Sequence, residues 1–296
     1  MDARLVWDTW RRILTDDAVV ARVLDRDGAT IDPDWAGWSA AERAILADYA
    51  ATPVATETNI GMYREGLVRN ALAALSLVPM SQQLLYASGL DVDAVAADYA
   101  KADGYADHGP HFWRAAAGFV AHLAARAEFA APAHQDVLSL DAATIALARR
   151  LGKRADAWPD RPPRKTRRIG DPTTRFVASR AATIVRSAHD LTDWIVNPTD
   201  FDPTDALKVS AHCWLVYFPA AEADRACAEL SERAARVFAL LERSRTVAEL
   251  SVALGAVPLA DVIGILDSLA ALGVVTQLPA STRIAPAATV ADHVFG

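Results

Sequence analysis

The chain has 296 residues, 52% of them hydrophobic and 23% charged, and its 30 Lys and Arg against 37 Asp and Glu leave a formal charge of −7. Such a composition excludes a wholly disordered chain, because the apolar fraction is high enough to build buried cores. The excess negative charge argues against a protein that coats nucleic acid through its overall field. The length suits two ordinary domains.

The sequence also favours a cytoplasmic protein without a membrane partner. No stretch reaches the ~18 consecutive apolar residues that a membrane-spanning helix needs. The N-terminus carries Asp2 and Arg4 where a signal peptide would need an apolar segment. Two cysteines, Cys213 and Cys227, cannot make a disulfide framework or a four-cysteine zinc site, so a reducing compartment is the simplest setting.

Apolar residues recur at helical spacing from residue 1 to about 152, which predicts an all-helical bundle domain over 1–152. A capping box of Ser39 and Glu42 predicts the start of one helix, because each side chain can bond a free backbone N–H of the first turn. The helices expected in this domain cover residues 40–51, 59–77, 80–87, 91–102, 110–129 and 132–151.

A basic, proline-containing linker is predicted at 153–171. Within it, residues 161–168 hold five positive charges and two prolines. Clustered positive charge could bind an acidic partner or RNA. No aromatic residue is interleaved to stack on bases, so we interpret the segment as a solvated linker and expect no nucleic-acid partner.

Beyond the linker, residues 172–296 are expected to form a smaller α+β domain. Short β-rich runs at 175–178 and 182–185 precede a stronger one at 207–218. The second half of this third run is apolar at every position, which predicts a strand covered on both faces.

The last hundred residues are expected to follow the order helix, helix, helix, strand. The predicted segments are a helix at 222–242, a helix from the capping box of Thr246 and Glu249 to Gly255, a helix at 258–273 and a strand from Val274. A tight helix-turn-helix followed by a β element is a winged-helix pattern. The predicted fold class is therefore mainly α with a smaller α+β part, a helical bundle followed by a winged-helix-like domain.

No familiar catalytic motif is present: there is no glycine-rich phosphate loop, nucleophile elbow, Cys-x-x-Cys or His-Glu-x-x-His. The one eye-catching cluster is Asp107, His108 and His111, whose side chains could bind iron or zinc. Gly109 and Pro110 separate the histidines, so we favour a structural role in which one bonds a loop and the other packs beside Trp113. We therefore expect no catalytic residue and no metal site in this chain.

The winged-helix pattern is compatible with two functions. In a transcriptional regulator with a helical effector domain, the second helix of the helix-turn-helix would enter the DNA major groove. Here that helix, 259–269, has two aspartates and no basic residue, so it would repel the DNA backbone. The same helix could instead line an apolar groove beside a sheet edge, to which a peptide adds a strand.

Two parts of the chain resemble known families. The C-terminal segments resemble the precursor-peptide recognition element of ribosomal peptide biosynthesis, whose prototype is the small chaperone of pyrroloquinoline quinone biosynthesis. The helical half is similar to partner subunits of multinuclear nonheme iron oxidases, a family that includes the companion subunit of the methanobactin oxidase. The residues that carry these resemblances are 207–218, 234–242, 246–250 and 266–275 for the first, and 59–64, 89–91, 112–115 and 128–129 for the second.

The resemblance implies a non-catalytic subunit that binds the leader of a precursor peptide and forms a heterodimer with an iron-dependent oxidase. The iron would be held by the oxidase, and this chain would carry no cofactor. The leader peptide would then dock along the strand and the third helix, on the apolar residues Trp214, Val216, Phe218, Val262 and Leu266. The alternative interpretation is that all five are core residues.

Overall fold

The computed structural model describes residues 2–25, 35, 37–109, 112–152, 174–198, 207–220 and 224–278. These residues are mainly helical and also form two three-stranded sheets, which confirms the predicted fold class. The chain divides into two compact units, one of residues 1–146 and 188–209 and the other of residues 147–187 and 210–296.

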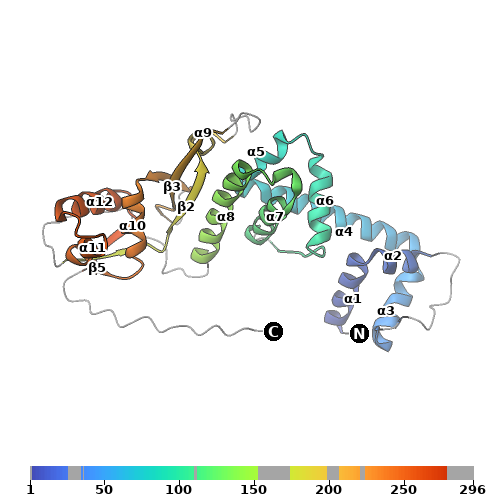
Figure 1. Ribbon diagram of the computed structural model, residues 1–296. Helices are drawn as coiled ribbons and strands as arrows, with labels where there is room; N and C mark the ends of the chain where they lie inside the picture. The colour runs from blue at the N-terminus through green and yellow to red at the C-terminus, as the bar shows by residue number, and fades with distance from the viewer. Residues whose placement is uncertain are drawn as a thin grey trace. The chain divides into compact units, whose positions relative to one another are not determined.

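The first unit is built from helices (Figure 1). Three of them begin with a proline, a residue well suited to the first turn because it lacks the N–H that would have no partner there. The elements are α1 (Ala3–Thr15), α2 (Asp17–Leu24), α3 (Ala40–Ala50), α4 (Pro53–Ala74), α5 (Pro79–Ala87), α6 (Val92–Ala102), α7 (Trp113–Ala125), α9 (Thr192–Val196) and the first part of α8 (Pro132–Gly152), with the 3-10 turns η1 (Leu75–Leu77) and η2 (Ala127–Phe129).

Local signals in the sequence locate several of these helices. The capping box of Ser39 and Glu42 is present at the start of α3, as predicted. Helix α4 starts at Pro53, six residues before the predicted position, because that proline opens this helix in addition to ending the previous one. Its contacts with α2, α3, α6 and α7 make it the central helix of the unit.

Residues 188–209 group with the helical unit, although the sequence alone assigns them to the second domain. The side chain of Asp136, in α8, accepts hydrogen bonds from the backbone N–H groups of Ala188 (2.8 Å) and His189 (3.1 Å). It also bonds Nδ1 of the His189 ring at 2.8 Å. Three bonds to one carboxylate therefore attach this segment to the helices.

The second unit contains both sheets and three further helices (Figure 1). One sheet has the strand order β5-β1-β6 and the other β2-β3-β4. The elements are β1 (Arg175–Ala178), β2 (Ala182–His189), β3 (Val209–Tyr217), β4 (Ala226–Leu230), α10 (Glu232–Leu240), β5 (Arg245–Thr246), α11 (Val247–Ala253), α12 (Leu259–Ala271) and β6 (Val275–Leu278). The capping box of Thr246 and Glu249 begins α11, as predicted.

The helix predicted at 222–242 is wrong in its first half, because residues 226–230 form strand β4. Helix α10 begins only after Ser231, whose hydroxyl accepts a hydrogen bond from the N–H of Ala234. Pairing with β3 outweighs the helix propensity of Ala226 and Ala228, since strand formation depends on cross-strand packing more than on intrinsic preference.

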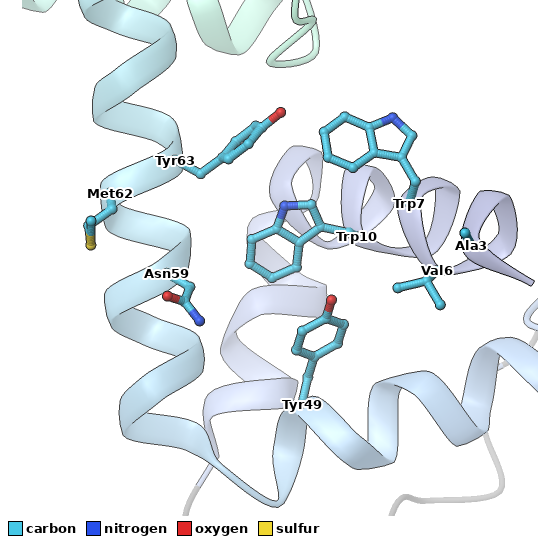
Figure 2. A pocket seen from close by; sticks show the side chains of 8 residues that line it. All are labelled: Ala3, Val6, Trp7, Trp10, Tyr49, Asn59, Met62 and Tyr63. Atoms are coloured by element: carbon cyan, nitrogen blue, oxygen red, sulfur yellow. The ribbon is translucent and has the colours of Figure 1, made fainter. Parts of the chain in front are cut away.

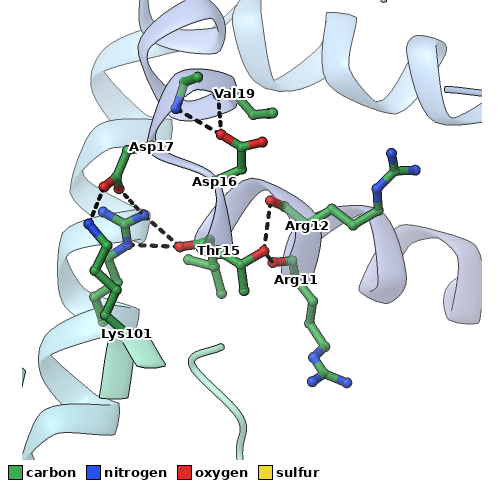
Figure 3. Close-up of polar contacts among 10 residues, drawn as sticks. Arg11, Arg12, Thr15, Asp16, Asp17, Val19 and Lys101 are labelled. Carbon is green, nitrogen blue, oxygen red and sulfur yellow. Dashed lines mark hydrogen bonds and ion pairs between the residues drawn. The ribbon is translucent and has the colours of Figure 1, made fainter. Parts of the chain in front are cut away.

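A charged cluster joins α1, α2, α4 and α6 within the first unit (Figure 3). The guanidinium of Arg64 donates to the carbonyl of Leu14 (3.1 Å from Nε) and to the carboxylate of Asp17 (3.0 Å). Lys101 donates to the other oxygen of Asp17 at 2.6 Å. These contacts lower the pKa of Asp17, first through the bond from Lys101 and then through the bond from Arg64. Arg64 therefore satisfies a carbonyl at the end of α1 and ties two helices to α4.

We predict that Arg64→Met lowers the free energy of unfolding by about 1–3 kcal/mol, because it leaves the Leu14 carbonyl and Asp17 without this donor. The matched control is Arg69→Met on the same helix, where Arg69 contacts only an exposed Glu65 at 3.5 Å among the ion pairs described. Its effect should stay within about 0.5 kcal/mol. Urea unfolding of both variants measures the difference, and equal losses would contradict the role given to Arg64.

Candidate functional site

The structure places all five residues predicted to contact a peptide in the protein interior. Their exposed fractions are 9% or less. Strand β3 lies between β2 and β4, and its residues 213–217 pair with β4, so this part of the strand cannot accept a further strand. The buried residues are Trp214, Val216 and Phe218 on or just after β3, and Val262 and Leu266 on α12.

These side chains also lie on different sides of the sheet. Leu215 packs in one core with Val262 and Leu266, whereas its neighbours Trp214 and Val216 point to the opposite face because side chains alternate along a strand. The predicted covering of β3 on both faces is confirmed. Five residues divided in this way cannot line one groove, and we assign them to the interior.

A charge on β3 tests this assignment. We predict that Val216→Asp lowers the free energy of unfolding by roughly 3–5 kcal/mol, because it buries an unpaired carboxylate. The matched control is Val209→Asp in the same strand, at a side chain that is 80% exposed, which should change stability little. Chemical unfolding of the two variants gives the comparison. A stable Val216→Asp protein would mean that this face of β3 is open.

The first edge of this sheet, strand β2, already has bonds from α8. Near the start of β2, the guanidinium of Arg150 donates to the backbone carbonyls of Arg180 (3.0 Å) and Ala182 (3.3 Å). At its end, Asp136 accepts from the N–H groups of Ala188 and His189. Side chains of a helix thus occupy backbone groups at both ends of this strand, which is a common way to protect an edge.

The second edge, strand β4, pairs with β3 alone among the described strands. The register runs from Tyr217 opposite Ala226 to Cys213 opposite Leu230. In an antiparallel pair, alternate residues direct their N–H and C=O groups away from the partner strand, so part of the β4 backbone points outward. We identify β4 as the candidate binding edge.

Partly buried apolar side chains of this unit pack against its core. Leu230 on β4 and Ile263 and Ile265 on α12 pack against the same buried cluster as Leu215. Glu229, which is exposed on β4, bonds Nδ1 of His212 on β3 at 2.7 Å. The edge therefore combines main-chain groups with nearby apolar surface and one carboxylate. The sequence contained one usable signal for it, the capping serine at position 231 that ends the strand.

A thiol and two charged groups form a second cluster in this unit. The thiol of Cys213 on β3 donates to the carboxylate of Glu232 at 3.0 Å, and Arg186 on β2 bonds the other oxygen of Glu232 at 2.9 Å. Burial raises the pKa of the Cys213 thiol, and the bond to Glu232 raises it further, whereas the positive charge of Arg186 lowers it. The thiol is thus held protonated and unreactive.

Removing the charge of Glu232 should make this thiol more acidic. In Glu232→Gln, Arg186 acts on Cys213 without the opposing carboxylate, so we predict that the pKa of the thiol falls. The pH dependence of alkylation by iodoacetamide, measured in a Cys227→Ser background, reports the change. Glu229→Gln removes a carboxylate that bonds His212 instead, and it should leave the alkylation profile unchanged. The same profile in all three proteins would contradict the assigned contact.

The histidine cluster of the sequence is only partly described. His108 bonds the carboxylate of Asp103 at 2.6 Å, which fits the predicted structural role of a loop histidine. His111 and the basic linker at 153–171 lie outside the described residues. Within the described part of the chain, no three His, Cys, Asp or Glu side chains gather into a group that could hold a metal ion. No described helix is long and apolar enough to cross a membrane.

Comparison with known proteins adds no assignment: no protein-family model matches the chain, and no curated protein matches its sequence.

Proposed function

We propose that this protein binds an extended peptide as an added strand on β4 and presents it to a separate catalytic subunit. The proposal rests on a difference between the two edges of the sheet. Backbone groups of β2 already bond the side chains of Arg150 and Asp136, whereas β4 pairs with β3 alone among the described strands. When a peptide adds to a sheet edge, main-chain hydrogen bonds give affinity and side-chain contacts give specificity.

The identity proposed for the two partners rests on the family resemblance of the sequence. The peptide would be the leader of a ribosomally made precursor, and the catalytic subunit an iron-dependent oxidase that forms a heterodimer with this chain in the cytoplasm. The chain itself would be an accessory subunit without a cofactor. Its mechanism would be positional, because holding the peptide next to the oxidase makes an encounter between two molecules effectively local. A stable heterodimer interface would bury at least ~1,000 Å².

The chemistry of α12 supports a peptide ligand over DNA. The exposed positions of this helix include Asp261 and Asp267 and no basic residue. Arg233 of α10 lies 3.6 Å from Asp261, so this positive charge is already paired. A recognition helix that carries carboxylates towards solvent would repel phosphates, and it has none of the arginine or lysine side chains that commonly contact guanine.

A pair of proline substitutions on β4 tests the binding edge. Cys227 and Ala228 are consecutive, so one directs its N–H towards β3 and the other away from it. We predict that the proline variant at the outward position loses peptide binding at a smaller cost in melting temperature than the other variant, because its N–H takes no part in the pairing with β3. The variant at the inward position should lose stability. Binding is measured by co-purification with short peptides encoded beside the gene.

The matched controls keep the backbone N–H: Cys227→Ala and Ala228→Ser should bind as the wild-type protein does. Hydrogen exchange gives a second readout, since a bound peptide should slow exchange in β4 and leave β2 unchanged. The proposal is wrong if a folded proline variant at each position still captures the peptide. Retention of DNA instead of peptide, with a steep dependence on salt, would favour the winged-helix regulator.

A further inference from the structure

Four aromatic side chains of the first unit surround an open cavity of about 590 Å³ (Figure 2). Trp7 and Trp10 come from α1, Tyr49 from α3 and Tyr63 from α4. A cavity of this volume is within the range of small-molecule sites, which is roughly 300–1,000 Å³. We call it the aromatic cavity.

The rings of the aromatic cavity form adjoining walls. Trp7 and Trp10 each meet Tyr63 at a steep angle, with interplanar angles of 71° and 83° and centroid distances of 5.8 and 6.3 Å. Tyr49 packs against Trp10 with a centroid distance of 5.0 Å. Trp7 is 42% exposed, so the cavity is accessible from solvent. Rings arranged at steep angles around a space are typical of sites that bind organic cations.

Arginines of the same unit already cover neighbouring aromatic rings. The guanidinium of Arg12 lies 3.5 Å from the centroid of Trp38, and that of Arg22 lies 5.7 Å from Trp35. Trp35 and Trp38 belong to the same hydrophobic cluster as Trp10. Within the described residues, no arginine or lysine lies over the four rings of the aromatic cavity. The ring of Trp7, which is 42% exposed, is therefore available to a cation from outside the chain, whereas Trp10 is 8% exposed and largely covered by its neighbours.

The polar groups of the aromatic cavity restrict the kind of cation. None of the residues described as lining it is charged, and its polar side-chain groups are the Asn59 carboxamide, the indole N–H groups and the two tyrosine hydroxyls. Burial raises the pKa of Tyr49 and of Tyr63, so both hydroxyls are neutral at physiological pH. A primary ammonium or a guanidinium loses hydrogen bonds to water when it enters the cavity. No carboxylate lines the cavity to replace those bonds. A fully alkylated ammonium has no N–H to satisfy.

We propose that the aromatic cavity binds a small molecule that carries a quaternary ammonium group, held against the exposed ring of Trp7 with Tyr49 and Tyr63 beside it. This function is independent of peptide binding on β4, which belongs to the other unit. The attraction comes from the ring quadrupoles and is electrostatic, so it distinguishes a cation from a neutral group of the same shape.

Titration with choline and with its neutral isostere 3,3-dimethyl-1-butanol tests the proposal. The readout is the indole N–H signals of the eight tryptophans in ¹⁵N-labelled full-length protein. Choline should shift the signals of Trp7 and Trp10 and leave that of Trp38, which Arg12 covers, unchanged. The alcohol should bind at least about fivefold more weakly because it lacks the charge. Ethanolamine, a primary ammonium, should also bind more weakly than choline.

Two variants complete the experiment. Trp7→Leu removes the most exposed ring, so it should abolish the choline-induced shift of Trp10 without unfolding the protein. Tyr86→Leu removes an aromatic side chain that is 50% exposed outside the cavity, and it should bind choline as the wild-type protein does. Equal affinity for choline and the alcohol, equal affinity for choline and ethanolamine, or no shift of Trp7 and Trp10 would each overturn the proposal.

Discussion

The central position of β3 is the constraint on which the second unit depends. Residues 213–217 of this strand lie between β2 and β4, and the side chains of residues 213–216 are buried on both faces. This half of β3 cannot pair with a further strand, and it fixes where the neighbouring strands lie. Because α8 supplies bonds to the backbone near both ends of β2, the proposed added strand would pair with β4.

The elements that the sequence predicts well are those with a local chemical cause. Both capping boxes are present, and Pro132 begins its helix as predicted, because caps and prolines act within one turn. Strand β1 at 175–178 is also recovered, and so is the two-sided burial of β3. Strand β4 was missed because its five residues, Ala226–Leu230, are mostly good helix formers, and they become a strand only through pairing with a segment nine residues earlier in the chain.

The candidate site was harder to predict, for a physical reason. Apolar residues on a strand and on a helix suit a buried core and a peptide groove equally well, so Val216 and Leu266 could not be assigned from their type. An edge strand binds through its backbone, which every sequence possesses, and its availability depends on what the rest of the fold leaves uncovered. The aromatic cavity is similar in this respect, since Trp7 and Tyr63 lie 56 positions apart and meet only when α1 packs near α4.

Binding through an edge strand would suit an accessory subunit. Main-chain bonds hold the peptide by its backbone, and alternate side chains of an added strand point away from the sheet on either face, where an oxidase could reach them. Burial and the bond to Glu232 keep the thiol of Cys213 protonated, and a protonated thiol is a poor ligand and a poor nucleophile. A cysteine of a peptide bound at β4 would be neither buried nor bonded to Glu232. A catalytic partner would therefore react with that cysteine in preference to Cys213.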